Sequence, residues 1–321
     1  MQTTSRNILL DLLKIIAALC VLAIHCGFLI ENNTILYQSI TNGLFRIAVP
    51  LFFCINGFFL FSVFKNRRIK IWAKRVGILY LVWMLIYSYF WVYLNDFNLL
   101  KMSTTLLFGF NHLWYLAALL VSGLVLYLFR EASNKVLIAS SIILFSTGIA
   151  IQYLGQSQVF SQEPLLNKLI NYPPLHRNFL LFAFPLLCIG YLIRRINLHT
   201  KLKKKTVIIW LIISVLILVA DRLVGYYYFT NNITLNMNIS FLLLSPVLLI
   251  TAFKFKVSSN LNSKLLSSYS IAIYLVHPLI IFFLFNVTAL SPTTTTFVTI
   301  LLSVISSYIL IKLNRKLKYI L

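Results

Sequence analysis

The sequence predicts an all-α integral membrane protein, a bundle of about ten transmembrane helices with both termini in the cytoplasm. Three observations support this fold class: the composition, the recurrence of apolar stretches and the side on which the cations fall. Of the 321 residues, 60% are hydrophobic and only 11% are charged, whereas soluble domains have about 25% charged residues. Such a chain cannot cover a soluble globule with polar groups. It is also too rich in apolar residues to be a disordered protein.

Apolar stretches of spanning length recur along the whole chain and make residues 1–321 one transmembrane domain. A bilayer core about 30 Å thick is crossed by about 20 apolar residues in a helix. We expect spans at about 8–30, 45–64, 76–94, 113–129, 136–154, 179–193, 206–224, 239–253, 270–289 and 297–311.

Two segments need a separate justification. The first apolar stretch resembles the core of a signal peptide, but no small-residue cleavage site follows it, so we expect a retained helix. The longest outer segment, 155–178, contains the adjacent prolines Pro173 and Pro174. Because proline interrupts a helix interior, we expect a structured cap or a short helix there and no span.

The cations predict the orientation of the bundle. There are 28 Lys and Arg against six Asp and Glu, a formal net charge of +22. Loops rich in Lys and Arg stay in the cytoplasm. The loops at 65–75 and 194–205 contain six cations each and are therefore assigned to the cytoplasm. If ten spans alternate from there, 22 of the 28 cations lie on the cytoplasmic side. This charge is spread over alternate loops and not gathered on one face, so we expect no nucleic-acid partner.

The sequence gives no sign of a metal site or a disulfide framework. The cysteines Cys20, Cys26, Cys54 and Cys188 all lie in predicted spans, without paired spacing in a loop, and are expected to act as small buried hydrophobic residues. A phosphate-binding loop, a dinucleotide fingerprint and a pair of histidines at zinc spacing are all missing from the sequence. We therefore expect no metal cofactor.

The first predicted helix carries three ionisable residues, Asp11, Lys14 and His25. Such groups cost about 2.5–3.5 kcal/mol each at the centre of a membrane, which makes them candidates for function. Lys14 and His25 differ by about 20° in azimuth and by about 16 Å along the helix axis. Asp11, Ala18 and His25 recur every seven residues on the same stripe. The helix therefore has one polar face, and small Ala18 lets another backbone approach its middle.

Simpler interpretations of these residues exist. Asp11 and Lys14 are placed to form an i,i+3 ion pair near the interface, with Lys14 reaching towards the cytoplasmic headgroups. His25 has no charged neighbour in sequence and lies too deep for this explanation. It is either a core histidine bonded to another helix or a catalytic group, because a neutral imidazole in a partly dry site is a suitable base for a hydroxyl.

Five motifs, in this order along the chain, give the sequence a resemblance to the bacterial integral-membrane acyltransferases of the type 3 family. They are Asp11–Lys14 with His25, Arg46–Gly57, His112–Leu116, Arg177-Asn178 leading to Gly190-Tyr191, and Ile273–Pro278. The family has Arg where this chain has Lys14, which keeps the charge but loses the planar fork of the guanidinium. Ten spans is the usual core of this family.

The resemblance implies a reaction. An acyl group, usually acetyl, is transferred from cytoplasmic acetyl-CoA to a hydroxyl of a cell-surface polysaccharide or lipid-linked sugar, by a multi-pass protein of the inner (cytoplasmic) membrane of a bacterium. His25 is then the general base for the hydroxyl or a transient carrier of the acyl group, two roles that the sequence leaves open. Asp11 orients or charge-balances Lys14, from which the pantetheine arm extends towards His25. Lys74 and Arg75, next to a span, are the candidates for contact with the phosphates of coenzyme A.

The remaining candidates lie at the outer ends of helices. Arg46 is expected to hold a charged group of the acceptor or to stabilise the oxyanion, or merely to anchor the outer interface. Arg177 has a similar candidate role. His112 and Trp114 either anchor the interface, as aromatic residues do, or bind substrate, with Trp114 stacked on a sugar ring. We interpret His277, before Pro278, as mainly structural.

Two other classes of protein compete with an enzyme. A glycan or lipid transporter or flippase fits ten spans with buried charges, although the prolines do not divide the chain into matching halves. A structural or sensor subunit of an envelope assembly also fits and has no need of His25. The sequence does not name the acceptor, and a homo-oligomer remains open.

Overall fold

A computed structural model describes residues 7–32, 34–228, 235–255, 257 and 261–321, and in these residues every regular element is a helix. The long helices are α1 (Ile8–Cys26), α3 (Ala48–Lys65), α4 (Ile69–Ile86), α7 (Trp114–Leu128), α8 (Asn134–Gln156), α11 (Phe184–Arg195), α13 (Lys204–Tyr228), α14 (Phe241–Lys254), α15 (Ser263–Val287) and α16 (Pro292–Leu313). Shorter ones connect them: α2 (Thr34–Ile40), η1 (Leu44–Ile47), α5 (Ser88–Leu94), α6 (Leu99–Phe108), η2 (Asn111–Leu113), α9 (Pro164–Ile170), α10 (Pro173–His176), η3 (Phe179–Ala183) and α12 (Leu198–Lys201).

All ten predicted spans coincide with helices, but not all of these helices have spanning length. Within the described part, seven helical segments are long and apolar enough to cross a membrane, and an eighth is possible if α4 and α5 form one span. The other two positions hold η3 with α11, and the 14-residue α14. The all-helical membrane fold is therefore confirmed, while the number ten stays a prediction.

The predicted span at 76–94 is bent. The axes of α4 and α5 differ by 66° at a break at Tyr87. Neither proline nor glycine occurs there; the Tyr87 side chain is buried and donates a hydrogen bond to the Leu275 carbonyl on α15 at 2.9 Å. A tertiary contact that the local sequence does not encode thus accompanies the break.

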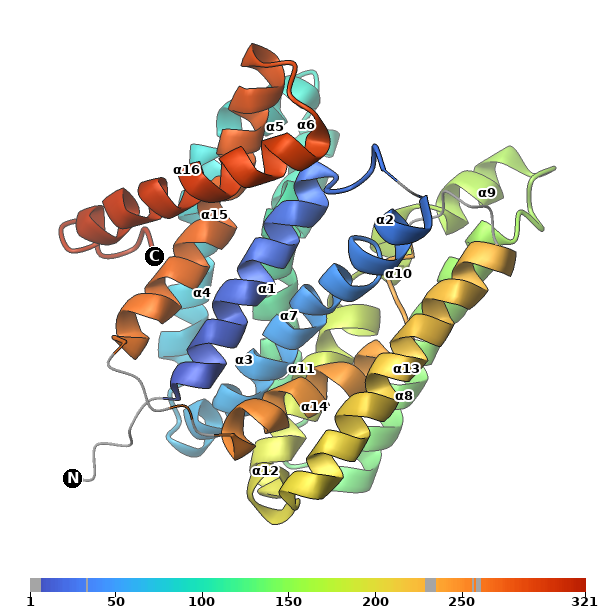
Figure 1. Ribbon diagram of the computed structural model, residues 1–321, viewed down its shortest axis with the longest axis vertical. Coiled ribbons are helices and arrows are strands. Elements are labelled where there is room, and N and C mark those ends of the chain that lie inside the picture. Colours follow the sequence, from blue (N-terminus) through green and yellow to red (C-terminus); the bar gives the residue numbers. More distant parts are fainter. Residues whose placement is uncertain (1–6, 33, 229–234, 256, 258–260) are drawn as a thin grey trace.

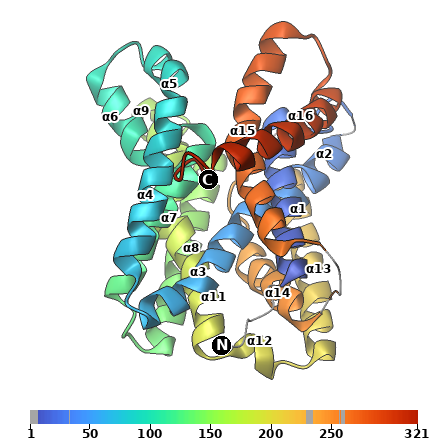
Figure 2. The ribbon, with the colours of Figure 1, turned by 90° about the vertical axis from the view of Figure 1, so that its left-hand side faces the viewer.

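The helices run between two ends of the molecule. The start of α1 and the cationic turn around α12 lie at the lower end in Figure 1; α5, α6 and the end of α15 lie at the upper end, and α2 and α9 lie in the upper half. Helix α16 crosses α15 obliquely, so the C-terminus lies about half-way between the ends in Figures 1 and 2. Placement of the C-terminal tail on the cytoplasmic side stays a prediction. Helices α9 and α10 confirm that the segment 155–178 is structured and contains short helices.

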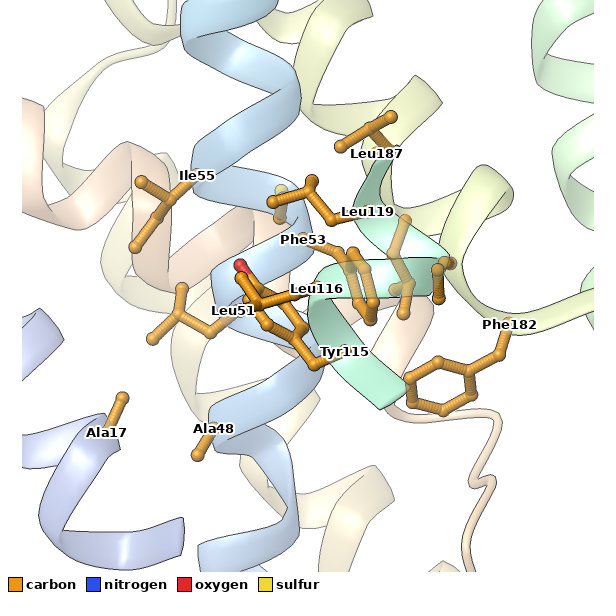
Figure 3. Close-up of a cluster of buried hydrophobic side chains, with 14 of the residues drawn as sticks. Ala17, Ala48, Leu51, Phe53, Ile55, Tyr115, Leu116, Leu119, Phe182 and Leu187 are labelled. Atoms are coloured by element: carbon orange, nitrogen blue, oxygen red, sulfur yellow. The ribbon is translucent and has the colours of Figure 1, made fainter. Parts of the chain in front are cut away.

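Close packing of α3 against α11 forms the centre of the bundle. Gly57 on α3 and Gly190 on α11 allow this approach: a Cβ at Gly57 would lie 1.8 Å from the Leu187 carbonyl oxygen, and one at Gly190 would lie 1.9 Å from that of Cys54. Around this contact, apolar side chains of α1, α3, α7, η3 and α11 form a buried cluster (Figure 3), which includes Ala17, Ala48, Leu51, Phe53, Ile55, Leu116, Leu119, Phe182 and Leu187.

Helix α1 is fixed at both ends. Asn7 accepts a hydrogen bond from the Leu10 amide at 3.1 Å and donates to the Ala252 carbonyl at 2.6 Å. Gly27 ends the helix with φ of +73°, a conformation that suits glycine. The four cysteines are unpaired as predicted, and three of them are buried while Cys20 is partly buried.

Candidate functional site

Two cavities lie along α1. The cavity beside the last turn of α1, called the outer cavity after the predicted orientation, has a volume of about 630 Å³. Its polar lining includes His25, Arg46, Gln152, Arg177 and Asn236, with Trp114 and Phe182 in its wall. The inner cavity has a volume of about 260 Å³ and is mainly apolar, with Lys14, Asn56, Tyr115, Ser270 and Tyr274 as its polar lining. These two cavities share no lining residue and are therefore separate from each other.

Helix α1 supplies one ionisable side chain to each cavity. His25, in its last turn, is exposed to the outer cavity, and Lys14, three turns earlier, lines the inner one. Eleven residues of helix separate the two by about 16 Å along the axis. Between them, Ala18 and Leu22 are completely buried. The helical spacing in the sequence thus becomes a division of the two groups between two chambers.

A layer of rings lies between the cavities. The ring of His277 on α15 lies 5.3 Å from the rings of both His25 and His112, measured between centroids. The His112 ring lies 5.2 Å from the Tyr274 ring, and Tyr274 lines the inner cavity. The Tyr274 hydroxyl donates to the His112 carbonyl. The rings therefore form a continuous series from His25 to the inner cavity.

The two buried histidines of this layer have unused hydrogen-bonding capacity. His277 Nδ1 lies 3.1 Å from the Ile273 carbonyl oxygen. Because a carbonyl only accepts, Nδ1 carries the proton and Nε2 has the lone pair. Within the described residues, His277 Nε2 and both ring nitrogens of His112 are buried without a partner. Buried polar atoms of this kind are uncommon and call for an explanation.

Two arginines share one acceptor in the outer cavity. Arg46, in η1, donates from Nη1 to Asn236 Oδ1 at 2.9 Å, and Arg177 donates to the same oxygen at 3.3 Å. Arg46 also donates from Nε and Nη2 to Asn42 Oδ1, at 3.2 and 3.0 Å. The Arg177 guanidinium lies 4.8 Å from the centre of the Trp114 ring. The arginines are thus held by amides and an aromatic face.

Gln152 of α8 fixes the segment that carries Asn236. Its side-chain oxygen accepts hydrogen bonds from the amides of Asn236 and Met237 at 2.7 and 2.9 Å, and its nitrogen donates to the Met237 carbonyl at 2.8 Å. The glutamine amide thus both accepts from and donates to the 236–237 backbone, as the backbone of a neighbouring β-strand would. Asn236 is therefore presented to the arginines by a rigid support.

Arg177 and its neighbour His176 lie just before the π-helical turn η3. Asn178 accepts hydrogen bonds from the amides of Leu180 and Leu181, both at 2.8 Å, which starts this turn. Burial, and then the positive charge of Arg177, lower the pKa of His176 to about 4. His176 is therefore neutral at pH 7, and it adds no charge to this side of the outer cavity.

In the inner cavity, the charge of Lys14 is compensated. Lys14 Nζ lies 2.9 Å from Asp11 Oδ1, and Asp11 also accepts a hydrogen bond from the Ser263 hydroxyl. Ser270 of α15 donates to the Lys14 carbonyl at 2.9 Å. On the opposite wall, Asn56 donates to the Tyr115 hydroxyl at 2.8 Å. The predicted i,i+3 ion pair is confirmed, and it faces a cavity.

The other candidates are placed less centrally. Lys74 and Arg75 are exposed on α4, just before Val76 and Leu79, which line the inner cavity. Trp114 lines the outer cavity, whereas His112 is 1% exposed and lies in the ring layer. Among the described residues, no group of three or more His, Cys, Asp and Glu side chains is arranged to hold a metal ion.

Comparison with known proteins decides the family. The family model described as "Acyltransferase domain" matches residues 7–312. The chain belongs to this acyltransferase family. The match confirms the resemblance carried by the five sequence motifs, and the apolar helices are those of a multi-pass membrane protein.

Two curated relatives of this chain have names of another kind. An "Amino-acid racemase" of Enterococcus faecalis is 30% identical over 96% of this chain and 46% of its own length. A "Serine/alanine racemase" of Enterococcus gallinarum is 28% identical over 61% of this chain and 30% of its own length. The chain spans less than half the length of these relatives. No solved structure matches this chain.

Sequence reasoning found part of this site. One cavity is lined by four residues that were predicted separately: His25, Arg46, Trp114 and Arg177. It missed Asn236, Gln152 and the contact of His277 with His25. A glutamine in an otherwise apolar span was the one available signal for Gln152, while Asn236 lies in a segment without a recognisable motif.

Proposed function

We propose that this protein is an O-acyltransferase that moves an acetyl group from acetyl-CoA to a hydroxyl of a cell-surface polysaccharide or lipid-linked sugar. It works in the cytoplasmic membrane of a bacterium, as a ten-span bundle with both termini inside. The family supports acyl transfer. The excess of cations at the proposed inner end supports this orientation.

The observation that carries the proposal is the division of α1 between two chambers. His25 faces the outer cavity, Lys14 faces the inner one, and a layer of His and Tyr rings separates them. An enzyme that takes its donor from one side of a membrane and its acceptor from the other needs two such chambers. In this proposal the reacting bond lies at the layer between them.

The inner cavity is assigned to the donor. Its apolar walls suit the pantetheine arm, and Lys14 supplies a cation at its polar edge. Lys74 and Arg75, exposed on α4 just before the lining residues of the inner cavity, are proposed to contact the phosphates of coenzyme A. Asp11 orients Lys14 through their ion pair. The thioester then reaches the layer formed by Tyr274 and His277, which must open a passage to His25.

His25 is assigned to the chemistry in the outer cavity. As general base, it takes the proton of the acceptor hydroxyl while the oxygen attacks the thioester carbonyl carbon; the carbon–sulfur bond breaks and the thiolate receives the proton. As a nucleophile, a His25 nitrogen first takes the acetyl group from sulfur and then passes it to the hydroxyl oxygen. Both routes yield an acetyl ester and free coenzyme A.

The direct test uses purified protein and acetyl-CoA labelled in the acetyl group. We expect slow hydrolysis or self-acetylation by the wild type, abolished in His25→Ala. An acetyl group recovered on His25 identifies the covalent route. Absence of any acetyl-CoA binding would contradict the enzyme proposal.

One observation favours a second candidate, a glycan or lipid carrier. Two chambers at different depths, separated by a layer of side chains, are also the arrangement of an alternating-access transporter. A carrier would move its substrate across a vesicle membrane without acetyl-CoA. In that case neither the wild type nor His25→Ala would hydrolyse acetyl-CoA.

A further inference from the structure

The outer cavity contains two cations without an acidic partner. All six acids of the chain lie in the described part, and none forms an ion pair with Arg46 or Arg177. Three of the acids pair with other cations: Asp11 with Lys14, Asp96 with Lys101 and Glu131 with Arg130. Glu31 and Asp221 accept hydrogen bonds from the amides of Thr293 and Ser240, and Glu163 is exposed at the start of α9.

The partners that the two arginines do have are neutral. Both donate to the single oxygen of Asn236, and within the described residues the other acceptor is Asn42. A guanidinium has five N–H donors, so each arginine keeps donors unused in the cavity. The positive charges of Arg222 and Arg177 both act on Arg46, and those of Arg177 and Arg46 act on His25. Two partly buried cations side by side are unfavourable unless an anion joins them.

The geometry suits an anion with two or more oxygens. Asn42 and Asn236 hold the plane of Arg46 from three of its donors, and Gln152 holds Asn236 in turn. Trp114 holds the plane of Arg177. Planar donors that are fixed before the ligand arrives bind carboxylate and phosphate with little loss of side-chain freedom.

We propose that the outer cavity binds an acceptor with a carboxylate or phosphate group between Arg46 and Arg177, and that this anchor directs the acceptor hydroxyl to His25. The inference rests on the proposed acyl transfer and names the chemical class of its acceptor. The cavity volume of about 630 Å³ is in the range of pockets for small ligands and single sugar units, and the Trp114 ring offers a face for a sugar ring.

Three probes of similar size test this proposal: glucuronate, glucose 6-phosphate and glucose. The first two carry the two candidate anions, and glucose is their neutral counterpart. Wild-type protein in lipid nanodiscs is expected to acetylate at least one anionic probe at least about tenfold more efficiently than glucose. Each charged hydrogen bond is worth about ten- to hundredfold in affinity, so Arg46→Gln and Arg177→Gln should each remove this preference. Preference for one anionic probe over the other tells carboxylate from phosphate.

Matched variants separate binding from folding. Lys168→Gln removes an exposed cation of α9 outside the cavity and should leave the preference unchanged. Arg46→Lys keeps the charge and should restore part of it if Arg46→Gln is folded. If Arg46→Gln lowers transfer to glucose as strongly as transfer to the anions, the arginines stabilise the oxyanion instead, and the proposal is overturned.

Calorimetric titration of the probes into His25→Ala distinguishes this inference from the proposed function. Saturable anion binding that Arg46→Gln weakens, without any acetyl transfer by the wild type, would uphold the anion site and reject the acyltransferase assignment. Acetyl transfer to glucose without binding of either anion would uphold the acyltransferase assignment and reject the anion site. Without saturable binding of glucuronate or glucose 6-phosphate, the inference is wrong.

Discussion

The two cavities differ most in how their charges are compensated. In the inner cavity, Lys14 pairs with Asp11 at 2.9 Å, and the rest of the lining is mainly apolar. In the outer cavity, Arg46 and Arg177 share one amide oxygen and have no acidic partner in the described residues. A compensated charge is compatible with a structural role, whereas uncompensated buried charges cost stability and indicate a ligand. The outer cavity therefore gives the stronger evidence for binding.

A substitution at Gly57 should have the largest effect, because it displaces α3, the helix that lines both cavities with different residues. Helix α3 lines the inner cavity with Asn56 and the outer one with Val49. In Gly57→Val, the Cβ would lie 1.8 Å from the Leu187 carbonyl oxygen. Overpacking costs about 1–3 kcal/mol, and more where backbone must move, so we expect loss of folded protein in detergent, measured by size-exclusion chromatography and thermal unfolding.

Gly77→Ala is the matched control for Gly57→Val. At Gly77 the nearest atom to a new Cβ is Leu120 Cδ2, at 3.8 Å, and alanine favours a helix by up to about 1 kcal/mol over glycine. We expect an unchanged or slightly higher unfolding temperature. Equal unfolding temperatures for the two variants would contradict the packing of α3 against α11.

His277→Gln tests whether the ring layer serves the outer cavity. We expect kcat to fall by about tenfold, less than the about hundredfold or more that loss of a general base costs, because His277 lies beside His25 and does not itself take the proton. The KM for acetyl-CoA should stay unchanged, because His277 lies outside the inner cavity. Steady-state kinetics measures both, and the pH dependence of kcat should shift as well. His199→Gln, at a buried histidine of α12, is the control and should change neither. A rise in KM alone would assign His277 to donor binding.

The smallest effect is expected for the exposed cations near the inner cavity. The double variant Lys74→Gln with Arg75→Gln should raise the KM for acetyl-CoA by about two- to threefold at low salt, since exposed charges contribute little. The effect should vanish at about 0.5 M salt, where charges are screened. Lys70→Gln, exposed on the same helix, should leave the KM unchanged. A salt-independent rise would mean that the substitutions alter the cavity wall and not a phosphate contact.

The sequence was most informative where function depends on one helix. The spacing of Lys14 and His25 predicts that they lie on one face of the helix at two different depths, and in α1 they line two cavities at different depths. It was least informative where distant segments meet. The pairing of Gln152 with Asn236, 84 residues apart, and the contact of His25 with His277 depend on tertiary packing. The bend at Tyr87 is accompanied by the hydrogen bond of its hydroxyl to α15, and no local proline or glycine predicts it.

The central claim is that α1 divides donor binding from chemistry, and paired measurements on His25→Ala and Lys14→Ala test it directly. The dissociation constant for acetyl-CoA and the rate of acetyl transfer are measured on the same preparations. We predict that His25→Ala keeps wild-type affinity and loses at least about hundredfold in rate. Lys14→Ala should bind acetyl-CoA more weakly and recover its rate at saturating donor. If both variants lose affinity equally, or if His25→Ala transfers acetyl groups at the wild-type rate, this division of α1 is wrong.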